Sequence, residues 1–180
     1  LKKQSPLCTG PKIGRIQKND DIYENYKKYL LSTIPKKMNF SGLKVVVDCA
    51  NGSAYKVAPE IFSEVGIDLI RESVKPDGKN INKKCGALFP KNLSKLVKNH
   101  KADLGISFDG DSDRLIVCDK NGQIINGDKI LAIAASSMLK QKKLRSKAIV
   151  STKMANIGLE DYLNKRGIRL FLTDVGDRYV

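Results

Sequence analysis

The sequence predicts an α/β fold of layered domains, in which mixed, mostly parallel sheets lie between helices. Short apolar or β-branched segments alternate along the chain with segments whose apolar residues have helical spacing, and this alternation is typical of parallel sheets with helical crossovers. The 180 residues are 41% hydrophobic and 29% charged, which is the composition of a globular protein. A chain of this length can bury one sizeable core or two small ones.

A polar N-terminal segment precedes the first expected helix. Asp20 is expected to cap a helix whose apolar residues lie near helical spacing. Residues 41–49, SGLKVVVDC, predict a buried strand because β-branched valines follow a Ser-Gly turn. An Asn-Gly turn then leads to a helix over 57–66, which ends at a glycine, and to a second strand over 67–72.

The central elements surround an acidic loop. A long connection over 74–90 leads to a helix at 90–100 and a third strand at 104–108. The loop DGDSDR (109–114) follows directly. A short strand at 115–118 then forms a hairpin-like turn and is expected to be an antiparallel edge strand.

The last elements repeat the alternation of helix and strand. Helices are expected at 127–139 and 158–167, and strands at 147–152 and 168–173. Ligands of such sheets gather at the carboxyl ends of the strands. One crevice is therefore expected to collect the polar residues that follow strands, which are Asp48, Asn51, Asp109 and Lys153.

The basic composition raises nucleic acid as a partner but gives it little support. The chain has 33 basic and 19 acidic residues and a net charge of +14. Its basic residues are 26 lysines and only 7 arginines, scattered over the whole length, and it has no tryptophan, so residues suited to base recognition and stacking are scarce. No apolar run approaches the ~20 residues of a membrane span, and no signal-peptide region is present. We therefore expect a cytoplasmic protein that binds neither membrane nor nucleic acid.

The cysteines and the single histidine are assigned no chemistry. Cys8, Cys49, Cys85 and Cys118 are too far apart in sequence for a zinc pair or a disulfide framework, so we expect reduced and mostly buried thiols. His100 falls near the end of a predicted helix, where a surface position is expected. A histidine-based catalytic triad is therefore disfavoured.

The loop DGDSDR carries the chemistry. Asp109, Asp111 and Asp113 occupy alternate positions after an apolar strand, and two charges ~5 Å apart repel by roughly 3 kcal/mol at an effective dielectric constant near 20. A shared divalent cation removes this repulsion, and oxygen ligands without histidine or cysteine suit Mg²⁺. Arg114 either faces a phosphoryl group beside the metal or pairs with the acidic loop.

The sequence also allows other interpretations. An EF-hand is excluded, because Arg114 stands where that motif needs glycine and Lys120 where it needs glutamate. A polar turn without metal is the simplest alternative. A haloacid-dehalogenase-type phosphatase is an enzymatic alternative, since residues 108–111 imitate its Asp-x-Asp motif. A basic nucleic-acid-binding module is the non-enzymatic one.

The sequence strongly resembles the α-D-phosphohexomutase superfamily, and within it the bacterial phosphoglucosamine mutase family. The segments VVVDCANGSAYKVAPEIFSEVG, NINKKCG, ADLGISFDGDSDRLIVCDKNGQIINGDKI and TDVGDRYV carry this resemblance in the expected order. It implies an enzyme that interconverts glucosamine 6-phosphate and glucosamine 1-phosphate through a phosphoserine and a bisphosphorylated sugar. A phosphomannomutase or phosphoglucomutase of the same superfamily is the closest alternative.

The resemblance also implies roles for individual residues. Asp109, Asp111 and Asp113 are the expected Mg²⁺ ligands, Arg114 the expected phosphoryl contact, and Lys153 and Arg178 expected substrate-binding residues. The expected partners are a phosphorylated hexosamine and the missing domains of the same polypeptide. The phosphoserine motif of the family is absent from these 180 residues, so this segment alone is expected to be inactive.

The resemblance divides the chain into a linker from a missing first domain (1–19), a metal-binding α/β domain (20–125) and an incomplete second α/β domain (126–180). The chain departs from the family pattern at three sites. Residues 87–89, Ala-Leu-Phe, replace a polar segment, and Asp174 replaces a frequent lysine. Ser112 replaces the loop's usual second glycine, a change that a negative backbone φ would tolerate.

Overall fold

The computed structural model of the chain describes residues 13, 19 and 21–180. The expected helix cap Asp20, the thiol of Cys8 and most of the expected linker lie outside the described residues. The described residues up to Met38 belong to one compact unit and those from Asn39 to Val180 to another. The first unit contains helix α1 (Asp21–Ser32), which has no buried residue.

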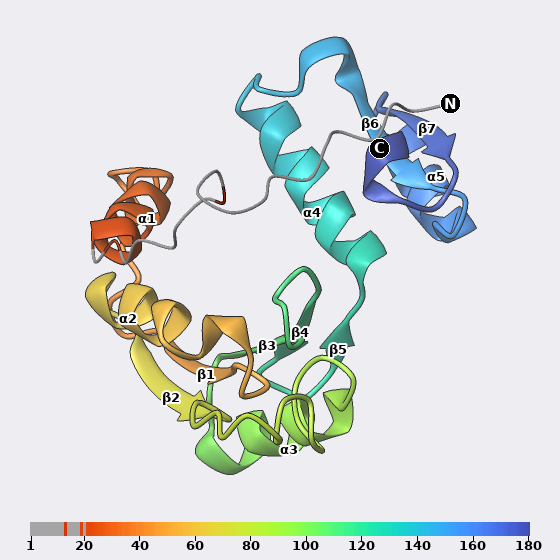
Figure 1. Cartoon of the computed structure of the whole chain (residues 1–180). Helices are drawn as coiled ribbons and strands as arrows, with labels where there is room; N and C mark the ends of the chain where they lie inside the picture. Colours follow the sequence, from red (N-terminus) through yellow and green to blue (C-terminus); the bar gives the residue numbers. More distant parts are fainter. Residues whose placement is uncertain (1–12, 14–18, 20) are drawn as a thin grey trace. The chain divides into compact units, whose positions relative to one another are not determined.

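A five-stranded mixed sheet forms the centre of residues 44–125 (Figure 1). Strand β1 pairs in parallel with β2 and β3, whereas β4 pairs antiparallel with both β3 and β5. In spatial order the strands are β2 (Asp68–Glu72), β1 (Lys44–Asp48), β3 (Leu104–Phe108), β4 (Leu115–Asp119) and β5 (Ile124–Ile125). The predicted α/β fold with a mixed sheet is confirmed.

The prediction that strand 115–118 lies at the sheet edge is wrong. Strand β4 has β3 on one side and the two-residue strand β5 on the other, with Val117 opposite Ile125. The reason is that the chain folds back once more after the turn at 119–122, where Gly122 has a φ of +79°. A strand as short as β5 gives no clear periodicity in the sequence.

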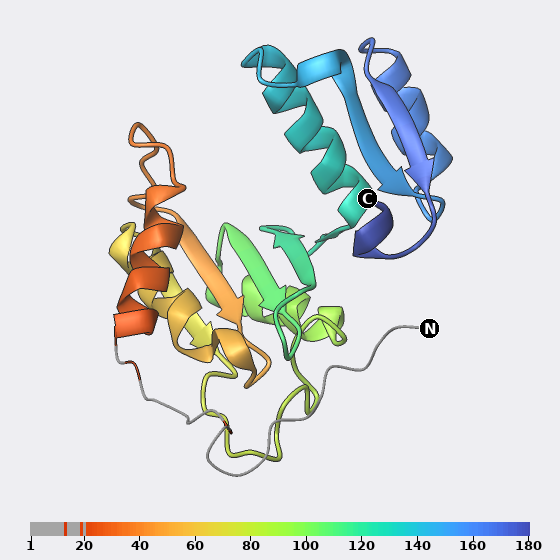
Figure 2. The same cartoon turned by 45° about the horizontal axis from the view of Figure 1, so that its top comes forward.

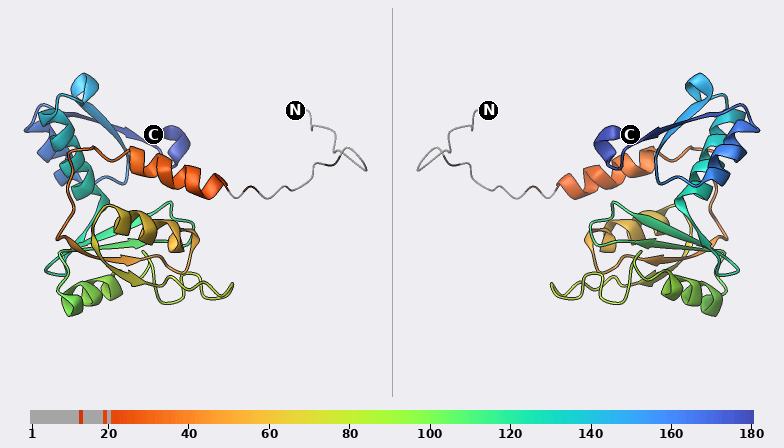
Figure 3. Two further views of the ribbon diagram at one scale, coloured as in Figure 1. Left: turned by 90° about the vertical axis from the view of Figure 1, so that its left-hand side faces the viewer. Right: turned by 90° about the vertical axis from the view of Figure 1, so that its right-hand side faces the viewer.

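Helices α2 and α3 cover opposite faces of this sheet (Figure 3). A 3-10 helix (Ser53–Tyr55) and α2 (Val57–Glu64) follow β1, and α3 (Pro90–His100) precedes β3. Because side chains alternate along a strand, Val45 and Val47 pack in the cluster of α2, and Val46 packs in the cluster of α3. Strand β1 is therefore buried on both faces, which explains its continuous apolar run.

Residues 127–173 contain a second, two-stranded parallel sheet and two helices, with a core of their own (Figure 2). Strands β6 (Ala148–Thr152) and β7 (Arg169–Thr173) pair in register, with α4 (Gly127–Lys140) and α5 (Ile157–Asn164) packed on them. Asn126 and Asn156 cap the two helices, since their side chains accept hydrogen bonds from the backbone N–H groups of Lys129 and Gly158.

The cysteine and histidine predictions are confirmed where the structure describes these residues. Cys49, Cys85 and Cys118 are free, buried thiols, and burial raises the pKa of Cys49 to about 12. His100 is exposed and is the last residue of α3. No helix among the described residues is long and apolar enough to cross a membrane.

Candidate metal centre

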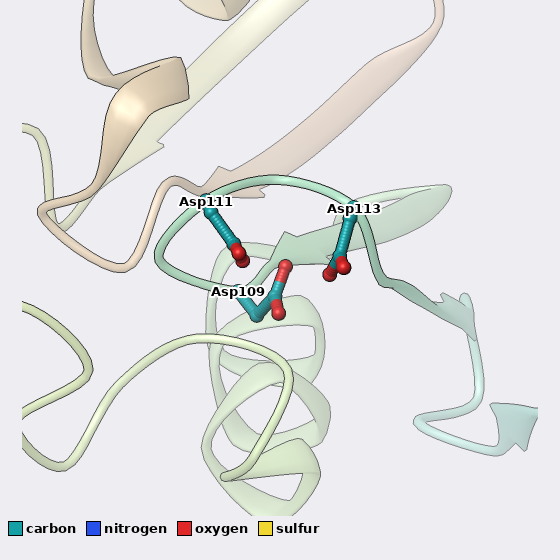
Figure 4. Close-up of side chains that lie close together, drawn as sticks. All are labelled: Asp109, Asp111 and Asp113. Carbon is teal, nitrogen blue, oxygen red and sulfur yellow. The ribbon is translucent and has the colours of Figure 1, made fainter. Parts of the chain in front are cut away.

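The three aspartates of the DGDSDR loop converge at the carboxyl end of β3. One carboxylate oxygen of each residue lies within 4.8 Å of those of the other two, and Figure 4 shows the side chains of Asp109, Asp111 and Asp113 pointing toward one another from the loop between β3 and β4. Asp109 is buried, whereas Asp111 and Asp113 are exposed. This is an all-oxygen donor set with one open side, which fits a hard cation such as Mg²⁺.

Arg114 holds the innermost carboxylate. Its Nε donates a hydrogen bond to Oδ2 of Asp109 over 2.7 Å, and its backbone N–H donates to Oδ1 over 3.0 Å. Nε also lies 3.5 Å from Oδ1 of Asp113. Of the two interpretations of Arg114, pairing with the acidic loop is therefore present in the structure. Only Nε of the guanidinium takes part in these contacts, and the side chain is 64% exposed.

The environment shifts the pKa values of Asp109 and Asp113 in opposite directions. Burial raises the pKa of Asp109, but the hydrogen bonds from the backbone and side chain of Arg114 outweigh it and leave that pKa below its ordinary value. Desolvation and the hydrogen bond with Asp109 raise the pKa of Asp113, and the charges of Asp111 and Asp109 raise it further. The buried Asp109 therefore loses its proton at a lower pH than the exposed Asp113 does.

The turn after β1 supports the loop from one side. The backbone N–H of Ser53 donates to the carbonyl oxygen of Gly110 over 2.8 Å, and a Cβ atom placed on Gly52 would lie 2.2 Å from the same oxygen. The hydroxyls of Ser53 and Ser112 lie 2.9 Å apart. Ser112 has a φ of +66°, so the condition for a tolerated Gly-to-Ser replacement, a negative φ, is not met. This position is in the left-handed region that favours glycine.

The segment 80–87 supports the loop from the other side. Its Ala87 donates a backbone hydrogen bond to the carbonyl oxygen of Phe108, the residue before Asp109, over 2.8 Å. The departure at 87–89 therefore leaves this contact intact, because a backbone group makes it. Sequence reasoning identified neither support as part of the site. Gly52 in the Asn-Gly turn is a sequence signal for the first support, since only glycine allows two backbones to approach this closely.

Lys153 and Arg178 belong to the part of the chain with the two-stranded sheet. Nζ of Lys153 lies 2.7 Å from Oδ1 of Asp174, and Nη2 of Arg178 donates to the Tyr179 hydroxyl over 2.7 Å. Lys153 follows β6, so it does not share the sheet edge of β1 and β3. The strands before Lys153 and before Asp109 belong to two different sheets, so a crevice that collects Lys153 with the other residues stays a prediction. Asp174, which stands where the family frequently has lysine, is thus the ion-pair partner of Lys153.

Two family models and several curated relatives match this chain. The family model for phosphoglucomutase/phosphomannomutase, alpha/beta/alpha domain II, matches residues 21–122, and the model for alpha/beta/alpha domain III matches residues 126–180. A phosphoglucosamine mutase of Phenylobacterium zucineum is 47% identical over 98% of this chain and 39% of its own length. One from Geotalea uraniireducens is 49% identical over 97% of this chain and 38% of its own length.

A solved structure gives the same result at the level of the fold. The phosphoglucomutase/phosphomannomutase family protein of Burkholderia thailandensis superposes with a TM-score of 0.74 at 28% identity, over 86% of this chain and 33% of the other. The chain thus spans about two fifths of the length of the curated relatives. It belongs to the phosphoglucomutase/phosphomannomutase family, the α-D-phosphohexomutases, of which it carries domain II and sequence of domain III.

Proposed function

We propose that the chain is the metal-binding part of a phosphoglucosamine mutase, which interconverts glucosamine 6-phosphate and glucosamine 1-phosphate through a phosphoserine and a bisphosphorylated sugar. The observation that carries the proposal is the convergence of three carboxylates within 4.8 Å in the DGDSDR loop. Relatives that carry this name are 47% and 49% identical over nearly all of the chain. A phosphomannomutase or phosphoglucomutase of the same family is the alternative; family membership gives no support to a haloacid-dehalogenase-type phosphatase.

Mg²⁺ is the proposed cation, held by Asp109, Asp111 and Asp113. When bound, it supplies charge neutralisation and orientation for in-line phosphoryl transfer. The chain's own residues prepare the site for it. Burial and the grip of Arg114 fix the orientation of Asp109, and the exposed Asp111 and Asp113 leave one side open to solvent. The terminal Nη groups of Arg114 are left for a phosphoryl oxygen, since Asp109 occupies Nε.

The remaining assignments concern the larger protein. We propose that residues 20–125 and 126–180 are two domains joined to a preceding one by residues 1–19, because each of the two sheets has its own core and each family model matches one of these parts. Lys153 and Arg178 are proposed to contact the phosphorylated hexosamine. Further domains of the same polypeptide are proposed to supply the phosphoserine, in a cytoplasmic enzyme.

Calorimetric titration of the chain with Mg²⁺ and Mn²⁺ tests the metal site. Wild-type protein is expected to bind one ion, and Asp111→Ala is expected to abolish the heat signal because it removes one of three ligands. Asp161→Ala is the matched control, since it removes an exposed carboxylate from α5. Equal binding by wild type and Asp111→Ala would contradict the assignment. Turnover of glucosamine, glucose and mannose phosphates by a protein of the relatives' full length separates the two mutase alternatives.

A further inference from the structure

Asp48 is a buried carboxylate to which the metal site assigns no role so far. It is the last residue of β1 and only 2% exposed. The other buried polar side chains among the described residues are Ser107 and Asp109. A buried carboxylate is costly unless hydrogen bonds satisfy it, so its partners show what it stabilises.

Three segments donate hydrogen bonds to Asp48. The backbone N–H of Ala50 donates to Oδ1 over 2.9 Å, and the backbone N–H of Gly86 donates to Oδ2 over 2.7 Å. The hydroxyl of Ser107 is a longer contact to Oδ2, at 3.4 Å. The donors come from the turn after β1, from the segment 80–87 and from β3 itself. One side chain therefore connects all three.

Each donor leads to the metal-binding loop within a few residues. Ala50 starts the turn whose Ser53 binds the carbonyl oxygen of Gly110. Gly86 precedes Ala87, which binds the carbonyl oxygen of Phe108. Ser107 lies two positions before Asp109 in the chain. The carboxylate of Asp48 thus connects the turn after β1, the segment 80–87 and strand β3, which together hold the loop.

The packing leaves little freedom at this junction. A Cβ atom on Gly86, where φ is +78°, would lie 2.6 Å from Cβ of Ala50 and 2.8 Å from the carbonyl oxygen of Phe108. The segment 80–87 therefore lies directly against the end of β3. Only a side chain with two acceptor atoms satisfies both backbone donors, because an amide in its place would turn an NH₂ group toward one of them.

We propose that Asp48 is a positioning residue of the cation site. It does not touch the cation; it holds the turn after β1, the segment 80–87 and the end of β3 in the arrangement in which Asp109, Asp111 and Asp113 converge. The inference rests on the proposed function, because it presupposes that these three carboxylates bind a divalent cation. Groups that hydrogen-bond metal ligands directly affect affinity by about 10- to 100-fold; Asp48 acts one contact further away, through the backbone that carries the ligands, so we expect an effect at the lower end of this range.

The test is Mn²⁺ titration of the full chain by calorimetry, with Asp48→Asn compared with wild type. We expect Asp48→Asn to bind Mn²⁺ at least about 10-fold more weakly and its amides at Ser53, Gly86 and Ala87 to exchange hydrogen faster in metal-free protein. Val46→Ala is the control, since Val46 is buried in the same strand on the side of α3. It should reduce the stability of the chain but leave the Mn²⁺ dissociation constant within about twofold, because it removes only packing.

The outcomes separate the inference from the proposed function. Wild-type binding with an equal dissociation constant for Asp48→Asn would overturn the inference and leave the metal site in place. A wild-type chain that binds no Mn²⁺ would overturn both. Should Asp48→Asn not fold, Ser107→Ala removes the longest of the three contacts; a dissociation constant unchanged from wild type in that variant would also overturn the inference.

Discussion

Gly52→Ala should displace the DGDSDR loop from the turn after β1. Gly52 has φ −107° and ψ −158°, which alanine adopts without strain, so the effect of the substitution is purely steric. Its Cβ atom would lie 2.2 Å from the oxygen and 2.7 Å from the carbonyl carbon of Gly110. Real Cβ contacts essentially never fall below 3.0 Å, so the two backbones must separate by at least about 0.8 Å, the difference between these distances.

The magnitude follows from two costs. Overpacking of this kind destabilises by about 1–3 kcal/mol, and loss of the hydrogen bond from Ser53 to Gly110, 2.8 Å long, adds about 1 kcal/mol. We expect Gly52→Ala to lower the free energy of unfolding by about 2–4 kcal/mol and to weaken Mg²⁺ binding. Urea denaturation followed by circular dichroism measures the first effect, and calorimetry the second.

Gly127→Ala is the matched control for this experiment. Gly127 is the first residue of α4, and a Cβ atom there would meet no atom within 4 Å. This variant should be neutral or more stable by up to about 1 kcal/mol, because alanine is the better helix former. A Gly52→Ala protein with unchanged stability and unchanged Mg²⁺ affinity would refute the reasoning that close backbone contact holds the loop in place.

Two further predictions concern the electrostatics of the site. In a protein of the relatives' full length, Arg114→Lys should retain the fold but lose roughly 10²-fold in kcat, because an ammonium cannot reproduce a bidentate grip on phosphate; wild-type kcat would show that this arginine only balances the aspartates. Mg²⁺ affinity should fall as the pH is lowered from about 7 to about 4. The pKa of Asp113 lies above its ordinary value of 3.8, so a proton replaces the cation at a higher pH than at an ordinary aspartate, and a constant affinity across this range would contradict the shift.

The sequence was sufficient to predict the layers and the convergence of the three aspartates in the DGDSDR loop. The valines of β1 are buried, and the apolar residues of β3 are partly buried, by packing that depends mainly on local pattern. The alternate spacing of three aspartates after a strand likewise predicts a shared cation, because the repulsion among them exists in any compact loop. Both arguments need only residues that are close in the chain.

Contacts between distant segments could not be predicted in the same way. The hydrogen bonds of Asp48 reach Gly86 and Ser107, which are 38 and 59 positions away. Nothing in the local pattern at position 48 distinguishes a residue that binds ligand from one that binds backbone N–H groups. The sequence did not predict strand β5 for a different reason, because its two residues carry no periodicity.

Ser112 shows how these distant contacts determine the geometry of the loop. A non-glycine residue in the left-handed region costs about 1–2 kcal/mol, and Ser112 adopts it with a φ of +66°. The loop therefore does not take this shape by its own preference. The hydroxyl contact with Ser53 and the backbone bond from Ser53 to Gly110 oppose that cost locally, and the surrounding turn supplies both. Ser112 stands between Asp111 and Asp113, whose carboxylates lie within 4.8 Å of that of Asp109, so the contacts that hold Ser112 also restrict the backbone of these two aspartates.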